Sequence, residues 1–424
     1  MDYTKMTKEE LLKEKESLEK EYKDYQAKGL KLDMSRGKPA PDQLEMAMGM
    51  LDVVDSSSEM ISESGQDTRN YGGLDGIPEC KEIMASIMEC DPSQVVVCGN
   101  SALNIMYDTV MRGYALGYLG NEPWIKQGKI KWLCPAPGYD RHFAITEHFG
   151  IEMINIPMTA DGPDMDMVED LVSKDAMIKG IWCVPKYSNP QGVVYSDETV
   201  RRMAALKPAA KDFRVFWDNA YAVHHLYDEP CHILNILDEA KKAGNEDMVF
   251  EFASTSKISF AGGGVAAFAS SAANVADFKK SMTIQTIGYD KVNQLRHVRF
   301  FKDGKGVEEH MKNHALKLRP KFEMVDSILE RDLAGKNVGT WLKPKGGYFI
   351  CFDTLEGCAT RTIQLAKECG VVMTGAGAPW PYHKDPKDST IRISPSYPSV
   401  EELEQAANIF TVCVRLAAVE KLLG

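Results

Sequence analysis

The chain has 424 residues, of which 44% are hydrophobic and 26% are charged, as is usual for a globular protein. This length exceeds what one hydrophobic core ordinarily serves, so we expect two or three packed units. The formal net charge of -11 argues against a broad surface for nucleic acid or anionic membranes. No segment reaches the roughly 18 consecutive apolar residues of a membrane helix, and the N-terminal segment lacks the apolar stretch of a signal peptide. We therefore expect a cytoplasmic protein that binds neither nucleic acid nor membrane.

The cysteines and histidines do not predict a metal site. The ten cysteines include no CxxC pair, and the spacing of Cys80, Cys90 and Cys98 matches no common zinc site. His224 and His225 are adjacent and cannot easily face one metal, so a structural role is the simpler interpretation. We expect reduced, mostly buried thiols and no bound metal.

The first predicted element is a charged amphipathic helix. Thr7 and Glu10 have the spacing of a capping box, and Gly29 suits the end of the helix. Four residues would share one apolar face: Leu11, Leu18, Tyr22 and Tyr25. The mixed charges indicate that the polar face of this helix is solvated. A more specific alternative is that the helix is an arm that packs on a partner subunit. We assign residues 1–50 to a helix and arm that pack with a small domain.

Seven short apolar segments follow, and helical patterns separate several of them. They lie at 94–99, 130–134, 152–158, 179–185, 214–218, 248–254 and 264–270. This alternation predicts an α/β domain with a mostly parallel, seven-stranded sheet. The segments are apolar throughout, as expected when helices cover both faces of the sheet. We assign this large domain to residues 51–300.

The pattern changes beyond residue 300. Helical segments at 306–333 and 360–370 flank a hairpin-like segment at 341–353, and a strong helix at 399–423 ends the chain. Ser399 and Glu402 have the spacing of another capping box. We interpret residues 301–424 as a smaller α+β domain.

Polar residues follow five of the predicted strands. They are Asn100 and Ser101, Tyr139, Asn189, Asp218 with Tyr221, and Ser254, Ser256 and Lys257. Ligands of open α/β sheets bind beyond the carboxyl ends of the strands, so these residues could converge on one crevice. Gly99, Asn100 and Ser101 open a helix whose free N–H groups suit a phosphate, although such residues are more often only caps. Ser254 and Ser256 could add donors.

A buried acid and a buried amine add to this set. Asp218 ends an apolar strand, where a carboxylate needs a cationic partner such as the nitrogen of a protonated pyridine ring. Asn189 and Tyr221 could bind an oxygen on the opposite edge of that ring, and Tyr139 could stack on its face. Lys257 follows an apolar strand, and an amine among apolar walls loses proton affinity and can attack an aldehyde. Each residue alone is more simply structural, but their occurrence in this order favours a ligand of this kind.

The chain resembles the fold-type I pyridoxal-phosphate aminotransferases, within the aspartate aminotransferase-like branch of class I. The resemblance runs from about Met34 to the C-terminus. Within the branch, the chain is most similar to a subgroup related to MocR-type aminotransferase domains. The motifs that carry it are SRGKP (35–39), NYGGLDGI (70–77), PAPGYDRH (135–142), PKYSNPQG (185–192), DNAYAVHH (218–225), STSK (254–257) and IRISPSYP (391–398). Each motif is weak alone, but their order and spacing are specific.

The resemblance implies a role for each cofactor residue. Lys257 would form the aldimine with pyridoxal 5'-phosphate and carry the proton between the substrate Cα and C4′ of the cofactor. Asp218 would pair with the pyridinium nitrogen. Tyr221 and Asn189 would bind the phenolic oxygen, and Tyr139 would stack on the ring.

The resemblance also implies how phosphate and substrate are held. The phosphate would be bound by residues around two turns: Gly99, Asn100, Ser101, Ser254 and Ser256. Tyr71 would reach the phosphate in the neighbouring subunit, which implies a homodimer with composite active sites. Arg392 would clamp the substrate α-carboxylate through a bidentate fork, and Gly37 would bring the backbone close to the substrate.

The chain departs from the family pattern in two places. The family usually has an arginine eight or nine residues after the lysine, where it neutralises the phosphate. Here those positions are Val265 and Ala266, directly after a run of three glycines. The phosphate must therefore find its charge elsewhere or rely on neutral donors. The motif NPQG in place of NPTG is a minor change, because Asn189 and Gly192 are kept.

We expect a transamination between L-aspartate and 2-oxoglutarate that yields oxaloacetate and L-glutamate. Aspartate is implied by the family branch and does not follow from the spacing of residues. A second cation would have to bind the side-chain carboxylate of such a substrate. Arg36, Lys186 and Lys291 are candidates, the last from the other subunit; Arg36 is preferred, although each could simply be a surface charge.

Two alternatives stay open, and a third is disfavoured. The same cofactor residues would serve an aminotransferase of other amino acids, a β-lyase or a decarboxylase. An effector-binding module of a transcription regulator shares this fold, but the 30 residues before the core are too few for a winged helix. A nicotinamide dehydrogenase is disfavoured, because no GxGxxG follows a strand.

Overall fold

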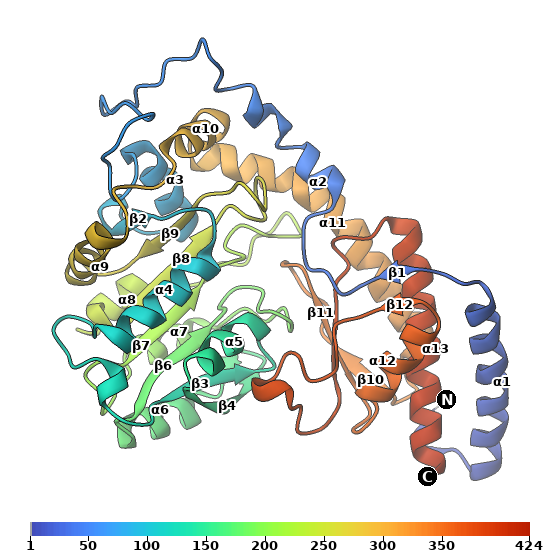
Figure 1. Ribbon diagram of the computed structural model, residues 1–424. Helices are drawn as coiled ribbons and strands as arrows, with labels where there is room; N and C mark the ends of the chain where they lie inside the picture. The colour runs from blue at the N-terminus through green and yellow to red at the C-terminus, as the bar shows by residue number, and fades with distance from the viewer. Residues whose placement is uncertain (1) are drawn as a thin grey trace.

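The computed structural model describes residues 2–424, which form a large and a small domain (Figure 1). The large domain contains an eight-stranded sheet in the order β2-β9-β8-β7-β6-β3-β4-β5. Its strands are β2 (Val95–Val97), β3 (Lys131–Ala136), β4 (Glu152–Thr159), β5 (Gly162–Pro163), β6 (Ile178–Cys183), β7 (Arg214–Asp218), β8 (Val249–Ser254) and β9 (Ala266–Ala269). Strands β4, β3, β6, β7 and β8 are parallel, whereas β9 is antiparallel to both neighbours. All seven predicted strands are confirmed; β5 was not predicted, because two residues carry no pattern.

Helices cover both faces of this sheet. One core contains side chains of α3 (Pro78–Met88), α6 (Met165–Lys174), α7 (Asp197–Ala204), α8 (Ile236–Lys242) and α10 (Lys291–Phe301). The opposite core contains side chains of α4 (Ala102–Ala115), α5 (Asp140–His148) and α9 (Ala272–Gln285). In β2, Val95 and Val97 belong to the first core and Val96 to the second. Burial on both faces explains why the strands are apolar without alternation.

The small domain is built on antiparallel strands β10 (Gly339–Trp341), β11 (Ile350–Thr354) and β13 (Thr390–Ile393). A parallel pair of β1 (Leu32–Asp33) and β12 (Val371–Val372) joins the N-terminal arm to it. Helices α1 (Lys8–Ala27), α12 (Ala359–Glu368) and α13 (Val400–Leu423) pack together in this domain, and the short helix α2 (Pro41–Glu45) follows the arm. Short 3₁₀ helices lie at Tyr3–Lys5, Met48–Leu51, Pro92–Gln94, Trp124–Lys126, Glu246–Met248 and Pro381–His383.

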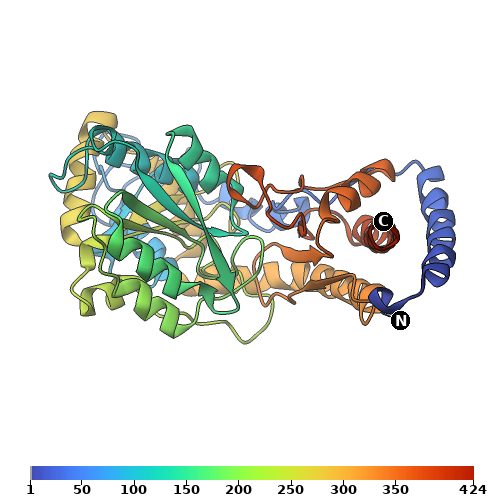
Figure 2. The ribbon, with the colours of Figure 1, turned by 90° about the horizontal axis from the view of Figure 1, so that it is seen from below.

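Helix α1 packs against α13 of the same chain, at the end of the molecule farthest from the large sheet (Figure 2). Both predicted capping boxes are confirmed: Thr7 and Glu10 begin α1, and Ser399 and Glu402 begin α13. Leu11, Leu18 and Tyr22 are buried as expected, while Tyr25 is only half-buried. The apolar face of α1 is therefore used within this chain.

The long helix α11 (Gly304–Leu333) connects the two domains (Figure 1). Val307 and Met311, near its start, belong to a core of the large domain. Leu318 and Phe322, farther along, belong to the core of the small domain. Because one helix serves both cores, the boundary after residue 300 stays a prediction.

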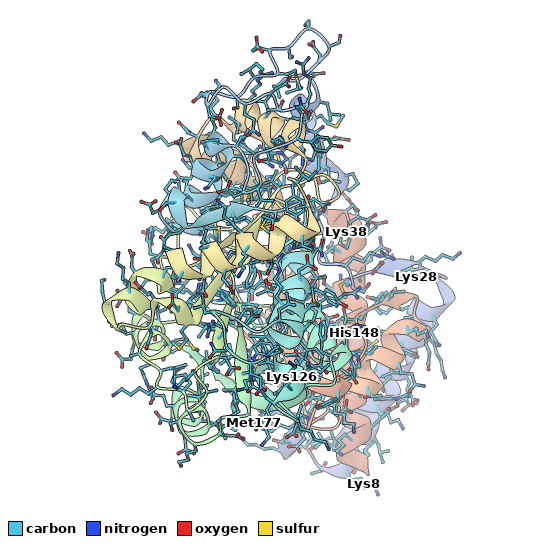
Figure 3. The ribbon with its side chains drawn as sticks, turned by 60° about the vertical axis from the view of Figure 1, so that its left-hand side comes forward. Lys8, Lys28, Lys38, Lys126, His148 and Met177 are labelled. Atoms are coloured by element: carbon cyan, nitrogen blue, oxygen red, sulfur yellow. The ribbon has the colours of Figure 1, made fainter. Side chains whose placement is uncertain are left out.

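Helices α4 and α5 lie side by side on one face of the sheet (Figure 3). The hydroxyl of Tyr107 in α4 is 3.2 Å from Nε2 of His148 in α5. Strands β2 and β3 run in the same direction, so both helices begin at the same edge of the sheet. This edge carries the candidate site. Across residues 2–424, no helix is both long and apolar enough to cross a membrane.

Candidate active site

A cavity of about 220 Å³ lies where the strand ends of the large domain face the small domain. Residues selected from the sequence line it together: Gly37, Ser101, Tyr139, Asn189, Asp218, Tyr221, Ser254, Ser256 and Lys257. Phe349, which precedes β11, lines the cavity from the small domain. Polar groups from at least five chain segments therefore meet in one space.

Lys257 occupies the turn that follows β8. Its Nζ atom lies 5.1 Å from the centre of the Tyr221 ring. Loss of solvation lowers the pKa of the Lys257 amine, and the attraction of Asp218 opposes this shift only in part. Burial raises the pKa of Tyr221 well above its ordinary value, so its hydroxyl stays protonated. The cavity thus contains an amine that loses its proton more readily than a surface lysine does.

Asp218 is buried at the end of β7. Its Oδ2 atom lies 2.9 Å from Nε2 of His142, while Oδ1 is buried and has no hydrogen-bond partner within residues 2–424. The His142 ring stacks on Trp182 with 4.4 Å between centroids and 11° between planes. Sequence reasoning missed His142, although it lies in the PAPGYDRH motif. Its position one helical turn after Tyr139 was the available signal, because such residues share a helix face.

Hydroxyl groups gather at the start of α4. Ser101 is the N-cap of this helix and accepts a hydrogen bond from the amide of Asn104. Ser254 donates to Ser256, which donates to the carbonyl of Asn100, over 3.1 and 3.3 Å. Asn100 itself turns toward the glycine run, where its amide donates to the carbonyl of Gly262 over 3.2 Å. Gly99, which precedes it, has a φ of +55° that permits this sharp turn.

The glycine run brings a different arginine close to this turn. Val265 and Ala266 are buried at the start of β9 and offer no charge. Arg296 of α10 places Nη2 3.9 Å from the point where a Cβ on Gly263 would lie. Its Nε atom is buried without a partner in the part of the chain that the structure describes. Arg296 has no marker in the sequence, because it lies 39 residues after Lys257 and belongs to another element.

Arg392 of β13 lies beside the cavity and contacts two of its lining residues, Asn189 and Phe349. Nη1 donates to Oδ1 of Asp140 over 3.0 Å and to Oδ1 of Asn189 over 3.4 Å, and Nη2 donates to the hydroxyl of Thr374 over 3.3 Å. The centre of its guanidinium lies 4.9 Å from the centre of the Phe349 ring. Asp140, Thr374 and Phe349 were not predicted. The guanidinium is thus held by four neighbours beside the cavity.

Residues 6–424 match the family described as aspartate amino-transferase. The chain belongs to the aspartate aminotransferase family. The aspartate aminotransferase of Corynebacterium glutamicum is 45% identical over 406 residues, which cover 96% of this chain and 94% of that protein. A crystal structure of an aspartate transaminase from Corynebacterium glutamicum is 43% identical, covers 100% of this chain and 99% of its own, and has a TM-score of 0.97. LysN, an alpha-aminoadipate aminotransferase of Thermus thermophilus, shares only the fold, with 18% identity, 92% coverage of both chains and a TM-score of 0.73.

Gly37 lies against the Phe349 ring, which leaves no room for a side chain at position 37. A Cβ at Gly37 would lie 2.0 Å from Cζ of Phe349, well inside contact distance. Because Phe349 in turn packs on Arg392, the glycine allows the ring to support the arginine. The sequence marked Gly37 through its motif, but its partner lies more than 300 residues away in the chain.

The three cations considered for a second carboxylate lie in different surroundings. The Arg36 side chain is 60% exposed, and its Nε atom pairs with Asp33 over 2.9 Å. Lys186 faces a separate hollow beside Glu251, where burial lowers the pKa of its amine. Lys291 is buried at the start of α10, and none of the three lines the cavity around Lys257. Arg36 is the one that adjoins a lining residue, Gly37.

Tyr71 lies on the surface and is 80% exposed. It precedes Gly72 and Gly73, both of which have positive φ, so the backbone of this loop is turned sharply. Its role toward a neighbouring subunit stays a prediction.

Proposed function

We propose that this protein is a pyridoxal-phosphate-dependent aspartate aminotransferase that converts L-aspartate and 2-oxoglutarate to oxaloacetate and L-glutamate. The observation that carries the proposal is the carboxylate of Asp218. Its Oδ1 atom is buried without a partner among the described residues, in the same cavity as Lys257. A buried carboxylate oxygen of this kind calls for a cationic donor, and a protonated pyridine nitrogen is one.

The residues present fit this cofactor at each of its functional groups. Lys257 would offer its amine to the aldehyde carbon, and Asp218 would accept a hydrogen bond from the protonated ring nitrogen. Ser101, Ser254 and Ser256 offer donors for the phosphate at the start of α4, where the helix dipole favours an anion. When bound, pyridoxal phosphate supplies a conjugated ring that takes up electrons from the substrate Cα.

The chain itself provides binding and proton transfer. Arg392 binds the substrate α-carboxylate, with Asn189 beside it. Lys257 then accepts the proton from the substrate Cα, and its lowered pKa favours the neutral amine that this step requires. The Tyr139 ring, which lines the cavity, would cover the bound ligand and limit the entry of water.

Phosphate charge and the second carboxylate need further cations. We assign the phosphate counter-charge in part to Arg296, which reaches the glycine run from α10. Arg36 stays the candidate for the side-chain carboxylate of aspartate, since it adjoins Gly37 and its side chain is exposed, with Asp33 as its present partner. Both assignments support a dianionic substrate beside a phosphorylated cofactor.

The proposal includes a homodimer with composite active sites, to which Tyr71 of each subunit contributes. We also propose that the protein is located in the cytosol and that it is related to MocR-type aminotransferase domains. The exposure of Tyr71 supports the proposed homodimer.

The direct test is to incubate the purified protein with pyridoxal phosphate and record its absorbance, then to couple oxaloacetate formation to NADH oxidation. We expect a visible band and activity in the wild type, and loss of both in Lys257→Ala. The surface variant Lys126→Ala (Figure 3) is the matched control and keeps both. A wild-type protein without a visible band would overturn the proposal.

Substrate class is tested by a screen of amino donors with 2-oxoglutarate. Aspartate and glutamate should exceed alanine and phenylalanine in kcat/KM, because only they carry a second carboxylate. Equal values for all four would refute the dicarboxylate assignment. Keto-acid formation that does not depend on 2-oxoglutarate would indicate a β-lyase. Release of CO2 without formation of a keto acid would indicate a decarboxylase.

A further inference from the structure

Arg392, the anchor proposed for the substrate α-carboxylate, already binds a carboxylate of this chain. Its Nη1 atom lies 3.0 Å from Oδ1 of Asp140, in a pair whose side chains are only 10% and 27% exposed. Ion pairs with this little exposure are screened less than surface pairs, so the contact restrains both side chains. Asp140 therefore competes for the same cation as the substrate.

The other neighbours of Arg392 are neutral. Nη1 also donates a hydrogen bond to Oδ1 of Asn189, and Nη2 donates one to the hydroxyl of Thr374. Nε is buried without a partner across residues 2–424. A bidentate carboxylate needs two adjacent N–H groups of the guanidinium. As long as Asp140 stays on Nη1, the end formed by Nη1 and Nη2 is partly occupied and its charge is largely neutralised.

Asp140 has a second position available to it. It is the first residue of α5, where unpaired backbone N–H groups and the helix dipole stabilise a negative charge. Because its side chain is partly exposed, withdrawal from Arg392 would not strand the carboxylate in an apolar core. The exchange between the two positions needs only a rotation of one short side chain.

We propose that Asp140 is a displaceable counter-ion of Arg392, and that the α-carboxylate of the amino donor or oxo acid takes its place. This inference rests on the proposed function. The exchange keeps the nearly buried guanidinium neutralised both before and after binding, which avoids an unpaired buried charge. It also makes every substrate compete with an internal carboxylate. A neutral amine or aldehyde cannot displace Asp140, so the contact selects ligands that carry an α-carboxylate.

The test is Asp140→Asn, which keeps the shape and an acceptor oxygen but removes the charge. We expect KM for aspartate and for 2-oxoglutarate to fall about fivefold, as for the loss of about 1 kcal/mol of competition. The kcat value should change much less. Succinate, a dicarboxylate that cannot react, should inhibit the variant at about fivefold lower concentration. Asp140→Ser provides the same readouts if the asparagine variant folds poorly.

Thr374→Val separates competition from simple orientation. It removes a neutral partner of Arg392 and should raise KM, whereas Asp140→Asn should lower it. If both variants raise KM, Asp140 only orients the arginine and the inference is overturned. Asp238→Asn alters another first-turn aspartate, in α8, and should leave KM unchanged. Absence of amino transfer by the wild type would instead refute the proposed function itself.

Discussion

Nε2 of His142 lies 2.9 Å from Oδ2 of Asp218, and this contact leaves Oδ1 as the unpaired oxygen of a buried carboxylate among the described residues. His142 is held in turn by its stacking on Trp182. The histidine therefore fixes the orientation of the group that would meet the cofactor nitrogen.

We expect His142→Ala to weaken the binding of pyridoxal phosphate to the cofactor-free protein by about tenfold or more. Hydrogen bonds to charged groups contribute roughly 1.5–3 kcal/mol, and about 1.4 kcal/mol corresponds to tenfold in affinity. A titration followed by absorbance measures the effect. His148→Ala, in the last turn of the same helix, is the exposed control. Equal loss in both variants would contradict a specific role for His142.

Lys257 should make the stability of the cofactor-free protein depend on pH. Its folded-state pKa is lowered below 10.5, so between the two values the unfolded chain binds more protons than the folded chain does. Stability therefore rises with pH across that window. We expect Lys257→Met to raise the Tm at pH 7, and we expect this gain to shrink as the pH approaches 10.5. Calorimetry at several pH values tests this, and a gain that is the same at every pH would argue against it.

Gly37→Ala should damage substrate binding through Phe349. The new Cβ would lie 2.0 Å from Cζ of that ring, so the ring must move away from its place against Arg392. Overpacking of this kind costs about 1–3 kcal/mol, and we expect KM for both substrates to rise about tenfold. Gly49→Ala is the matched control, because its Cβ would lie at an ordinary 3.5 Å from Phe300. Unchanged steady-state kinetics in Gly37→Ala would refute this support of Arg392.

Arg296→Gln tests which residue replaces the missing arginine after Lys257. We expect the variant to bind pyridoxal phosphate about tenfold more weakly, as for the loss of one charge-assisted contact. Pyridoxal, which lacks the phosphate, should bind the variant and the wild type equally. Arg201→Gln, at an exposed arginine of α7, is the control. Equal weakening for pyridoxal would show that Arg296 acts on the fold and not on the phosphate.

Tyr71 is tested by combining two variants in one dimer. If Tyr71 serves the neighbouring subunit, a heterodimer of Tyr71→Ala and Lys257→Ala contains one complete site. After unfolding and refolding together, the mixture should be more active than the mean of the two variants refolded separately. No gain, in a sample that light scattering shows to be dimeric, would place Tyr71 outside the partner's site.

Local chemistry made much of the fold predictable. Burial on both faces of the sheet makes each strand a short run of apolar residues, as at Val95–Val97, and capping boxes mark helix starts at Thr7 and Ser399. The two-residue strand β5 and the distribution of α11 between both cores have no such signature. A pattern can show that an element is buried, but not which neighbour buries it.

The same distinction applies to the site. Asp218 and Lys257 could be selected from the sequence because each is a charged residue at or shortly after the end of an apolar strand, where burial has a chemical cost. The partners of those residues could not. His142 meets Asp218 across 76 residues, and Asp140 meets Arg392 across 252. Such contacts depend on how strands and helices are brought together. The residues next to a histidine or an aspartate in the sequence do not indicate which distant side chain it will contact. The sequence alone thus determined which chemical groups are available, and the tertiary structure decided which of them hold one another in place.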